Sequence, residues 1–508
     1  MAGTPGGDEP VPTQNDPAEP GVAARAVSGS VYSVGSSFIT WTLGSIRLLL
    51  LTRLLMPADV GVSAQALLFL SLALILQEMG LNNALIHHKE VNERVLSTYF
   101  TMRMLLLAVT LLLLAALAPL LGRFYPTMPL LTPVLLSYTV AEVVRGMNGV
   151  QTTILTKNLA FRRLAVADVA SSLTMTVVAP YLAWQGWGVW ALVAEHVSGI
   201  LARAVVILGF TRAWRPRFGW DTAAAKWFLG FGKSVWTSTN LTYLITHFDD
   251  FWVGRVLGQS SLGLYARAYE FARYPRRVVA NPILSVFLPT FARLQEDRLR
   301  LSRAYFRATS LMVRVGFWFS LVFVLGARDL IELVGPQWLP MVPVFQLMIV
   351  YTLFDPLAVG ATDLLTATGH PHLVTRARLA QTLLFLPAVV LLGARWGIIG
   401  VALAADVMIL IGAIILFAYT RRIVSYSSLT LWLWPSVALL LTGLAVFGLS
   451  SFWEQMPPLA ALLGKAFFIS VLYVGLLWLT EREQLRIGWQ MIWGLLRPRV
   501  GPLLPGVR

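Results

Sequence analysis

Apolar runs of about 20 residues recur along this chain, and each is long enough to cross a hydrocarbon core of about 30 Å as a helix. The runs extend from residue 28 to residue 480. Hydrophobic residues make up 57% of the chain and charged residues only 13%, a balance far more apolar than a soluble domain needs. We therefore predict an all-α polytopic membrane protein.

We expect fourteen transmembrane helices, at 28–54, 60–85, 97–121, 129–153, 163–184, 187–210, 234–257, 263–289, 305–327, 341–366, 373–394, 397–420, 431–451 and 459–479. The basic residues then collect on alternate loops. The loops on one side of the membrane contain many basic residues, whereas those on the other side contain only Arg53, Arg123, Arg255, Arg328, Arg395 and Lys465. Because basic loops stay in the cytoplasm, both termini are predicted to be cytoplasmic. The net charge of +15 thus reflects membrane topology, and no nucleic acid partner is expected.

The chain contains a duplication. Residues 52–66 return 202 positions later as residues 254–268, with identical pairs at Arg53/Arg255, Leu55/Leu257, Gly61/Gly263, Ala64/Ala266 and Ala66/Ala268. A second pair of similar segments is WGVWALVAEHV (187–197) and WGIIGVALAADV (396–407). We predict two six-helix units at 28–210 and 234–420, which share one orientation and are related by an axis along the membrane normal.

The remaining segments lie outside the repeat. Residues 1–25 lack apolar periodicity and are predicted to be a disordered cytoplasmic tail. The aromatic and basic linker 211–233 is expected to lie on the cytoplasmic membrane surface, although a plain solvated linker is the alternative. Two extra transmembrane helices follow at 431–480, and residues 481–508 form a cytoplasmic tail.

Charged residues within the predicted spans are the candidate functional groups, because one at mid-bilayer costs about 2.5–3.5 kcal/mol. Arg47, Arg267 and Arg273 are the main candidates for holding a phosphate or diphosphate headgroup, which guanidinium forks match well. Arg145 and Arg276 complete this set. The alternatives are that Glu142 neutralises Arg145 and that Arg276 faces lipid phosphate.

Acidic residues within the spans are candidates for coupling or gating. They are Asp249, Asp250, Glu142 and Asp168. Asp249 and Asp250 point about 100° apart on a helix, so one can bind a cation or proton while the other bridges to an arginine. A salt bridge between helices is the alternative.

Two further expectations concern other charged positions. Glu270 is expected to pair with Arg267 or with Arg273, each three residues away. Arg103 and Arg314 are expected to extend into lipid headgroups from the ends of their helices.

No feature of the sequence indicates an enzyme. There are no cysteines, and His370 and His372 lack a third ligand nearby, so we expect no catalytic group, metal or cofactor. The predicted outer loops are short, and no phosphate-binding P-loop is present.

Four segments, in order, resemble one family. They are SIRLLLLTRLLMPADVGVSAQALLF (45–69), LTKNLAFRRLAVADV (155–169), DDFWVGRVLGQSSLGLYARAYEF (249–271) and GHPHLVTRARL (369–379). They are similar to segments of the polysaccharide transport branch of the MOP flippase superfamily, the Wzx-type transporters. The resemblance implies two six-helix bundles in a V around a central cavity, plus two C-terminal helices. It also implies flipping of undecaprenyl-diphosphate-linked oligosaccharide across the bacterial plasma membrane, for lipopolysaccharide or exopolysaccharide export.

The partners implied are a lipid-linked oligosaccharide, membrane lipids, a coupling ion (sodium or proton) and a polysaccharide polymerase. Three alternatives stay open at this point. A peptidoglycan-precursor flippase shares the cationic cavity, and a multidrug exporter of the same superfamily needs carboxylates in excess. A membrane glycosyltransferase or polymerase needs acids in sizeable outer loops.

Overall fold

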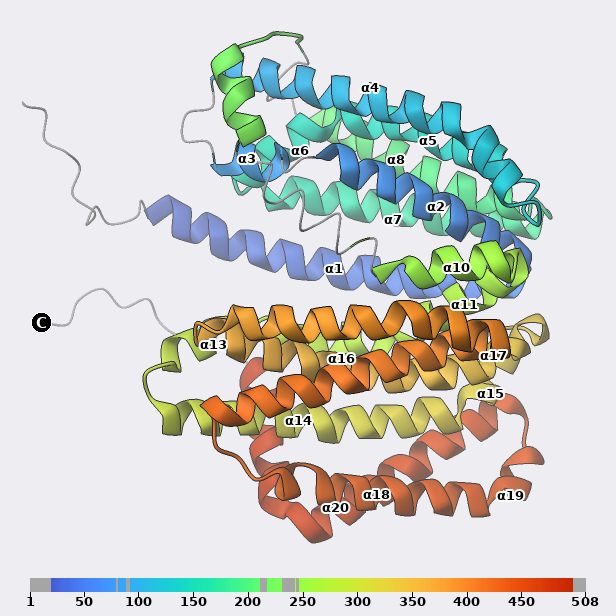
Figure 1. Ribbon diagram of the computed structural model, residues 1–508, viewed down its shortest axis with the longest axis vertical. Coiled ribbons are helices and arrows are strands. Elements are labelled where there is room, and N and C mark those ends of the chain that lie inside the picture. The colour runs from blue at the N-terminus through green and yellow to red at the C-terminus, as the bar shows by residue number, and fades with distance from the viewer. Residues whose placement is uncertain are drawn as a thin grey trace, which may run out of the picture. The chain divides into compact units, whose positions relative to one another are not determined.

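The computed structural model describes residues 20–78, 81–87, 92–210, 217–230, 243 and 246–496. This part of the chain is helical and contains no strand (Figure 1). Ten of its helices are long and apolar enough to cross a membrane. The protein is therefore an all-helical polytopic membrane protein, as predicted. The finer count of fourteen spans stays a prediction.

Contacts divide the chain into two units. Unit 1 comprises Met1–Leu54, Phe69–Pro119 and Pro133–Leu241, and unit 2 comprises Leu55–Leu68, Leu120–Thr132 and Thr242–Arg508. Residues 55–66, most of the early repeat segment, thus pack within unit 2, beside their own later copy.

Unit 1 is built from long helices that run alongside one another. Its described helices are α1 (Pro20–Leu54), the second half of α2 (Pro57–Glu78), α3 (Leu81–His87), α4 (Glu93–Phe124), α5 (Leu131–Met147), α6 (Gly149–Lys157), α7 (Phe161–Trp184) and α8 (Val189–Phe210). Helix α7 packs against both α1 and α8 (Figure 1). Helix α1 begins inside the predicted tail 1–25, of which residues 1–19 lie outside the described residues.

The described part of the predicted linker contains a short helix at 222–230. Asp221 starts this helix, since its Oδ1 accepts the backbone N–H groups of Ala223 and Ala224 at 2.8 and 3.1 Å. The fully buried Phe228 ring lies 5.8 Å from the ring of Tyr99 in α4. The linker is thus anchored to unit 1. Its position at the membrane surface stays a prediction.

Unit 2 follows the same pattern but contains more short helices. Its elements are α10 (Phe248–Val256), α11 (Gln259–Ala272), the π-helix η1 (Arg276–Ala280), α12 (Asn281–Leu284), α13 (Phe287–Leu294), α14 (Arg298–Leu325), α15 (Ala327–Val334), the 3-10 helix η2 (Pro336–Met341), α16 (Val342–Ala367), α17 (Pro371–Ile423), α18 (Ser428–Gly448), α19 (Ser450–Glu454) and α20 (Pro458–Leu496). Residues 234–242, 244 and 245 of the predicted span 234–257 lie outside the described residues.

A pair of glycines explains why the two repeat copies meet. A Cβ at Gly61 would overlap the backbone oxygen of Gln259, and a Cβ at Gly263 would overlap the backbone oxygen of Pro57. Each glycine therefore permits the start of α2 and the start of α11 to cross in backbone contact. The contacts are reciprocal, as expected for two copies related by local twofold symmetry.

The predicted span 263–289 is helical but is not one regular helix. The segment is divided into α11, η1, α12 and the start of α13. Pro275 and Pro282 lie in this segment, and a proline lacks the N–H that continues the helical ladder. By contrast, the predicted spans 373–394 and 397–420 form the two arms of α17, which kinks at Gly397 with φ of +60°. A side chain would be strained at that φ.

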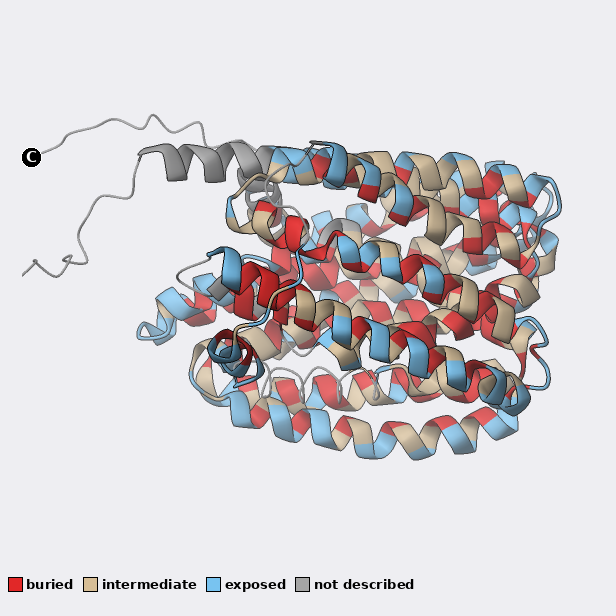
Figure 2. Ribbon diagram, turned by 90° about the horizontal axis from the view of Figure 1, so that it is seen from above, coloured by how far each residue is buried: buried red, intermediate tan, exposed pale blue. Residues whose placement is uncertain are grey.

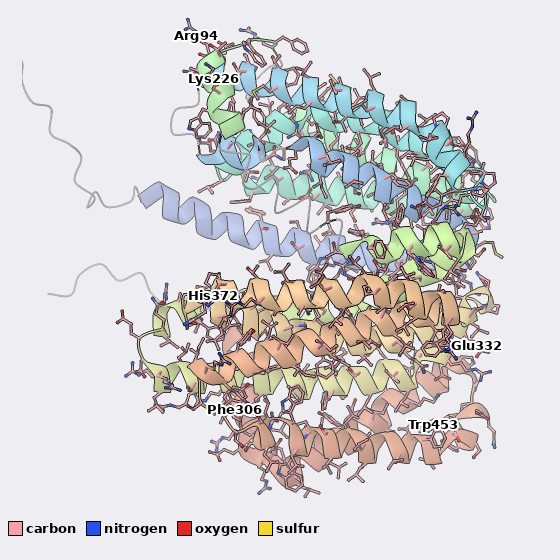
Figure 3. All side chains as sticks on the ribbon, in the orientation of Figure 1. Arg94, Lys226, Phe306, Glu332, His372 and Trp453 are labelled. Carbon is pink, nitrogen blue, oxygen red and sulfur yellow. The ribbon has the colours of Figure 1, made fainter. Side chains whose placement is uncertain are left out.

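Within each unit, buried and exposed residues alternate along the long helices (Figure 2). In unit 2, Glu332 and Trp453 lie at one end, and His372 and Phe306 lie toward the other (Figure 3). This grouping agrees with the predicted topology. With fourteen spans and cytoplasmic termini, the loops after the ninth and thirteenth spans lie on the outer side, and the loop after the tenth span, which contains His372, lies on the cytoplasmic side. In unit 1, Arg94 and Lys226 share one end (Figure 3).

Candidate functional site

Unit 1 contains a partly open cavity of about 410 Å³ that is lined by many polar side chains. Arginines, amides and hydroxyls make up most of its polar lining, which consists of Asn82, Arg103, Arg145, Asn148, Thr152, Thr153, Ser171, His196 and Arg203. These side chains come from six helices, α3 to α8, and from the junction between α5 and α6. Such a lining inside a membrane bundle suits a hydrophilic, anionic guest.

The position of Arg103 depends on a glycine. A Cβ at Gly149 would overlap the guanidinium of Arg103, so the glycine lets this side chain lie against α6. Arg103 donates to Asn82 Oδ1 at 2.7 Å and to the Tyr99 hydroxyl at 3.1 Å. Its Nε has no hydrogen-bond partner within the described residues. The prediction that Arg103 extends into lipid headgroups is therefore wrong, because the side chain turns into the cavity.

The cavity has an excess of positive charge. The buried Glu142 carboxylate lies 3.3 Å from Arg145 Nη2 and 3.0 Å from His196 Nε2. Asp168 forms an ion pair with Arg203. Glu142 and Asp168 therefore balance two of the three arginines, and the charges of these five side chains sum to +1. The predicted pairing of Glu142 with Arg145 is confirmed.

Arg47 has an acidic partner in the same unit. Its Nε lies 2.7 Å from Glu195 Oε1 in α8. Its Nη1 donates to Thr176 Oγ1 at 3.2 Å and to the backbone oxygen of Ser172 at 3.3 Å, both in α7. Arg47 thus connects α1 to α7 and α8, and it is not among the residues that line the cavity. Its predicted role in headgroup binding stays a prediction.

In unit 2, the predicted arginines on α11 and η1 are mostly paired. The buried Arg267 donates to Glu270 Oε2 at 2.9 Å, which confirms one of the two expected pairings. Its guanidinium carbon also lies 5.8 Å from the centre of the Trp338 ring. Arg276 forms an ion pair with the buried Asp355 of α16.

Arg273 differs from these two. Its guanidinium carbon lies 5.2 Å from the centre of the Tyr269 ring, a cation–π contact. Tyr269 is within electrostatic reach of Arg273, Arg276, Asp249 and Asp355. The structure therefore brings several predicted site residues of unit 2 together around one tyrosine.

The adjacent aspartates of α10 have different partners. Asp249 accepts a hydrogen bond from the Tyr265 hydroxyl at 2.7 Å, while its Oδ1 has no hydrogen-bond partner within the described residues. Asp250 lies 3.1 Å from His247 Nδ1. The expectation that the two carboxylates point to different places is confirmed, and any cation or proton binding by them stays a prediction.

Sequence reasoning missed two arginines of the cavity. Arg103 was assigned to headgroups, and Arg203 was not among the candidate binding residues. The signal for Arg103 was Gly149, because a glycine in a helix often marks close approach by another group. No local signal identified Arg203, whose partner Asp168 is 35 residues away.

Comparison with known proteins identifies the family. A family model described as polysaccharide biosynthesis protein matches residues 50–343, more than half of the chain. The chain belongs to this family. It is a Wzx-like member of the MOP superfamily, which confirms the resemblance of the four sequence segments.

Curated relatives extend over most of the chain. The lipopolysaccharide biosynthesis protein WzxC of Escherichia coli (strain K12) is 26% identical over 424 residues, which cover 80% of this chain and 84% of WzxC. The succinoglycan biosynthesis transport protein ExoT of Rhizobium meliloti (strain 1021) is 29% identical over 348 residues, covering 65% of this chain and 67% of ExoT.

Solved structures show the same fold. The inward closed conformation of the lipid II flippase MurJ aligns with a TM-score of 0.73 at 15% identity, over 90% of this chain and 100% of that chain. An inward-facing multidrug resistance MATE family transporter of the MOP superfamily aligns with a TM-score of 0.58 at 13% identity, over 75% of this chain and 95% of that chain.

Proposed function

We propose that this protein flips an undecaprenyl-diphosphate-linked oligosaccharide from the cytoplasmic to the outer leaflet of a bacterial plasma membrane. The names of the relatives support this proposal, since they describe lipopolysaccharide biosynthesis and succinoglycan transport. The MurJ fold supports it too, because that protein is a flippase of lipid II. In this proposal the protein is a transporter and not an enzyme.

The polar cavity of unit 1 is the observation that carries the proposal. Arg103, Arg145 and Arg203 supply fork-shaped donors that suit diphosphate oxygens. The amides of Asn82 and Asn148 and the hydroxyls of the neighbouring threonines can exchange hydrogen bonds with sugar hydroxyls. A multidrug exporter for organic cations would need carboxylates in excess, and among the described residues of this lining arginines are in excess instead.

Alternating access is the proposed mechanism. The duplicated unit supports it, since two similar bundles can move against each other about a site near the membrane centre. The two bundles arranged as a V belong to this proposal. Asp249 is the proposed coupling residue, because one of its carboxylate oxygens has no hydrogen-bond partner within the described residues.

Proteoliposomes test the proposal directly. Fluorescent undecaprenyl-diphosphate oligosaccharide would be placed in the inner leaflet, and its appearance in the outer leaflet would be followed with wild type and with Arg103→Gln plus Arg145→Gln. We expect flipping by the wild type and at least a tenfold slower rate in the double variant. Arg217→Gln, on the exposed linker, serves as the control. Flipping of lipid II at a higher rate would instead favour a peptidoglycan-precursor flippase, and no flipping of either lipid would overturn the proposal.

A further inference from the structure

A second, larger pocket lies within unit 2, between α14 and α20. Its volume is about 1020 Å³. One wall is a face of α14 with Leu311, Val315 and Trp318, and the opposite wall is a face of α20 with Val474 and Leu477. We call this pocket the α14–α20 groove. Its walls are mainly apolar, more so than those of the cavity in unit 1.

Arginines form one end of the groove. Arg307 on α14 and Arg482 and Arg486 on α20 line it and are exposed. Arg314 lies deeper and is neutralised by Glu481, whose Oε2 accepts from Arg314 Nε at 3.0 Å and from Nη2 at 2.6 Å. The lining itself contains one acid, Glu483. Together with Glu481, which pairs with Arg314, two carboxylates accompany four arginines, and the sum of these charges is +2.

The shape of α20 creates this arrangement. Glu481 has non-helical dihedral angles, φ of −142° and ψ of 45°, so the helix breaks at that residue. The segment 482–488 after the break also lines the groove. The buried ion pair between Arg314 and Glu481 holds α20 against α14 at this break. The Tyr473 hydroxyl of α20 also donates a hydrogen bond to the backbone oxygen of Arg314 at 3.1 Å.

The length of the groove matches one membrane leaflet. From Arg307 to Trp318, the α14 wall extends about 16 Å at 1.5 Å per residue, close to half of a hydrocarbon core of about 30 Å. The arginine end belongs to the end of unit 2 that contains Phe306 and His372 (Figure 3), which is the predicted cytoplasmic side. The groove therefore has a cationic end at the predicted cytoplasmic side and an apolar part about as long as one leaflet. This combination suits a lipid of the cytoplasmic leaflet.

We propose that the α14–α20 groove binds an anionic glycerophospholipid of the cytoplasmic leaflet. Its phosphate lies among Arg307, Arg482 and Arg486, and an acyl chain lies along Leu311, Val315 and Leu477. Charge complementarity selects the headgroup. The length of the groove fits an ordinary acyl chain better than a polyprenyl chain, which is several times longer. This site is separate from the proposed cavity for the transported substrate.

Native mass spectrometry of the full-length protein tests the proposal, with phosphatidylglycerol and phosphatidylcholine added in turn. We expect the wild type to retain phosphatidylglycerol preferentially. The triple variant Arg307→Gln, Arg482→Gln and Arg486→Gln should bind it at least about tenfold more weakly. The matched control carries Arg293→Gln, Arg300→Gln and Arg303→Gln, three exposed arginines outside the groove lining, and should behave like the wild type.

Two further measurements keep the test decisive if the triple variant unfolds. Val474→Trp, which fills the groove and leaves all arginines in place, should also weaken phosphatidylglycerol retention about tenfold. Inorganic phosphate should not displace the lipid, since it lacks an acyl chain. Equal retention of both phospholipids by the wild type would overturn the proposal. So would displacement by inorganic phosphate, or stronger binding of polyprenyl diphosphate to this groove.

Discussion

The cavity of unit 1 and the α14–α20 groove of unit 2 both contain several arginines, but the neighbours of those arginines differ. In the cavity, Arg103 lies among amides and hydroxyls such as those of Asn82 and Thr152. In the groove, the arginines lie above aliphatic and aromatic side chains such as Val315 and Trp318. The number of arginines therefore indicates an anionic ligand, while their neighbours indicate whether the rest of that ligand is a sugar or a hydrocarbon chain.

The two sites also use their acids differently. In the groove, one carboxylate, Glu481, receives two nitrogens of the buried Arg314. In the cavity, the hydrogen-bond partners of Arg103 among the described residues are both neutral, Asn82 and Tyr99. A paired, buried arginine supports structure, whereas an arginine with neutral partners keeps its charge available for a ligand.

The largest expected effect comes from Glu481→Leu. This change leaves the Arg314 guanidinium buried without a carboxylate, which should lower the free energy of unfolding by about 3–5 kcal/mol. Thermal unfolding in detergent micelles would measure the loss. Arg314→Met combined with Glu481→Leu should recover most of the stability, because the pair is then replaced by apolar side chains. Wild-type stability of the single variant would remove the structural role assigned to this pair.

Arg103→Gln should have the next largest effect, and on transport. Loss of one charged donor to a phosphate removes about 1.5–3 kcal/mol, equivalent to a flipping rate about tenfold to a hundredfold slower at limiting substrate. The proteoliposome assay would measure it, with unfolding temperature as the control for fold. An unchanged rate would show that the cavity does not hold the anionic group.

Gly149→Ala should have a smaller effect through the same arginine. The added Cβ displaces the Arg103 guanidinium, and we expect flipping about threefold to tenfold slower. In an Arg103→Gln background the glycine change should have almost no further effect, because coupled residues give non-additive changes. Additive effects in this double-mutant cycle would mean that Gly149 acts independently of Arg103.

The smallest effects should come from exchanging polar and apolar neighbours. Thr152→Val removes a hydroxyl from the cavity and should slow flipping about twofold to threefold. Val474→Thr adds a hydroxyl to the groove and should reduce phospholipid retention by a similar factor without changing the flipping rate. If both variants changed flipping equally, the assignment of different ligands to the two sites would be wrong.

Local patterns in the sequence determined much of this protein. Apolar runs gave most of the membrane helices, because a helix in lipid must satisfy its backbone internally and be apolar outside. The repeat located Gly61 and Gly263, whose crossing the structure shows. The pairs Glu142–Arg145 and Arg267–Glu270 were predictable, since residues three apart share a helix face.

Only the tertiary structure decided which charges from separate helices meet. Arg47 with Glu195, Arg276 with Asp355 and Arg314 with Glu481 are partners from different helices, the last pair being 167 residues apart in sequence. Helical periodicity fixes the direction of a side chain about its own helix axis, but the rotation and height of one helix against another come from packing. For that reason the sequence identified the cationic residues, and the fold decided which of them were neutralised and which lined a cavity.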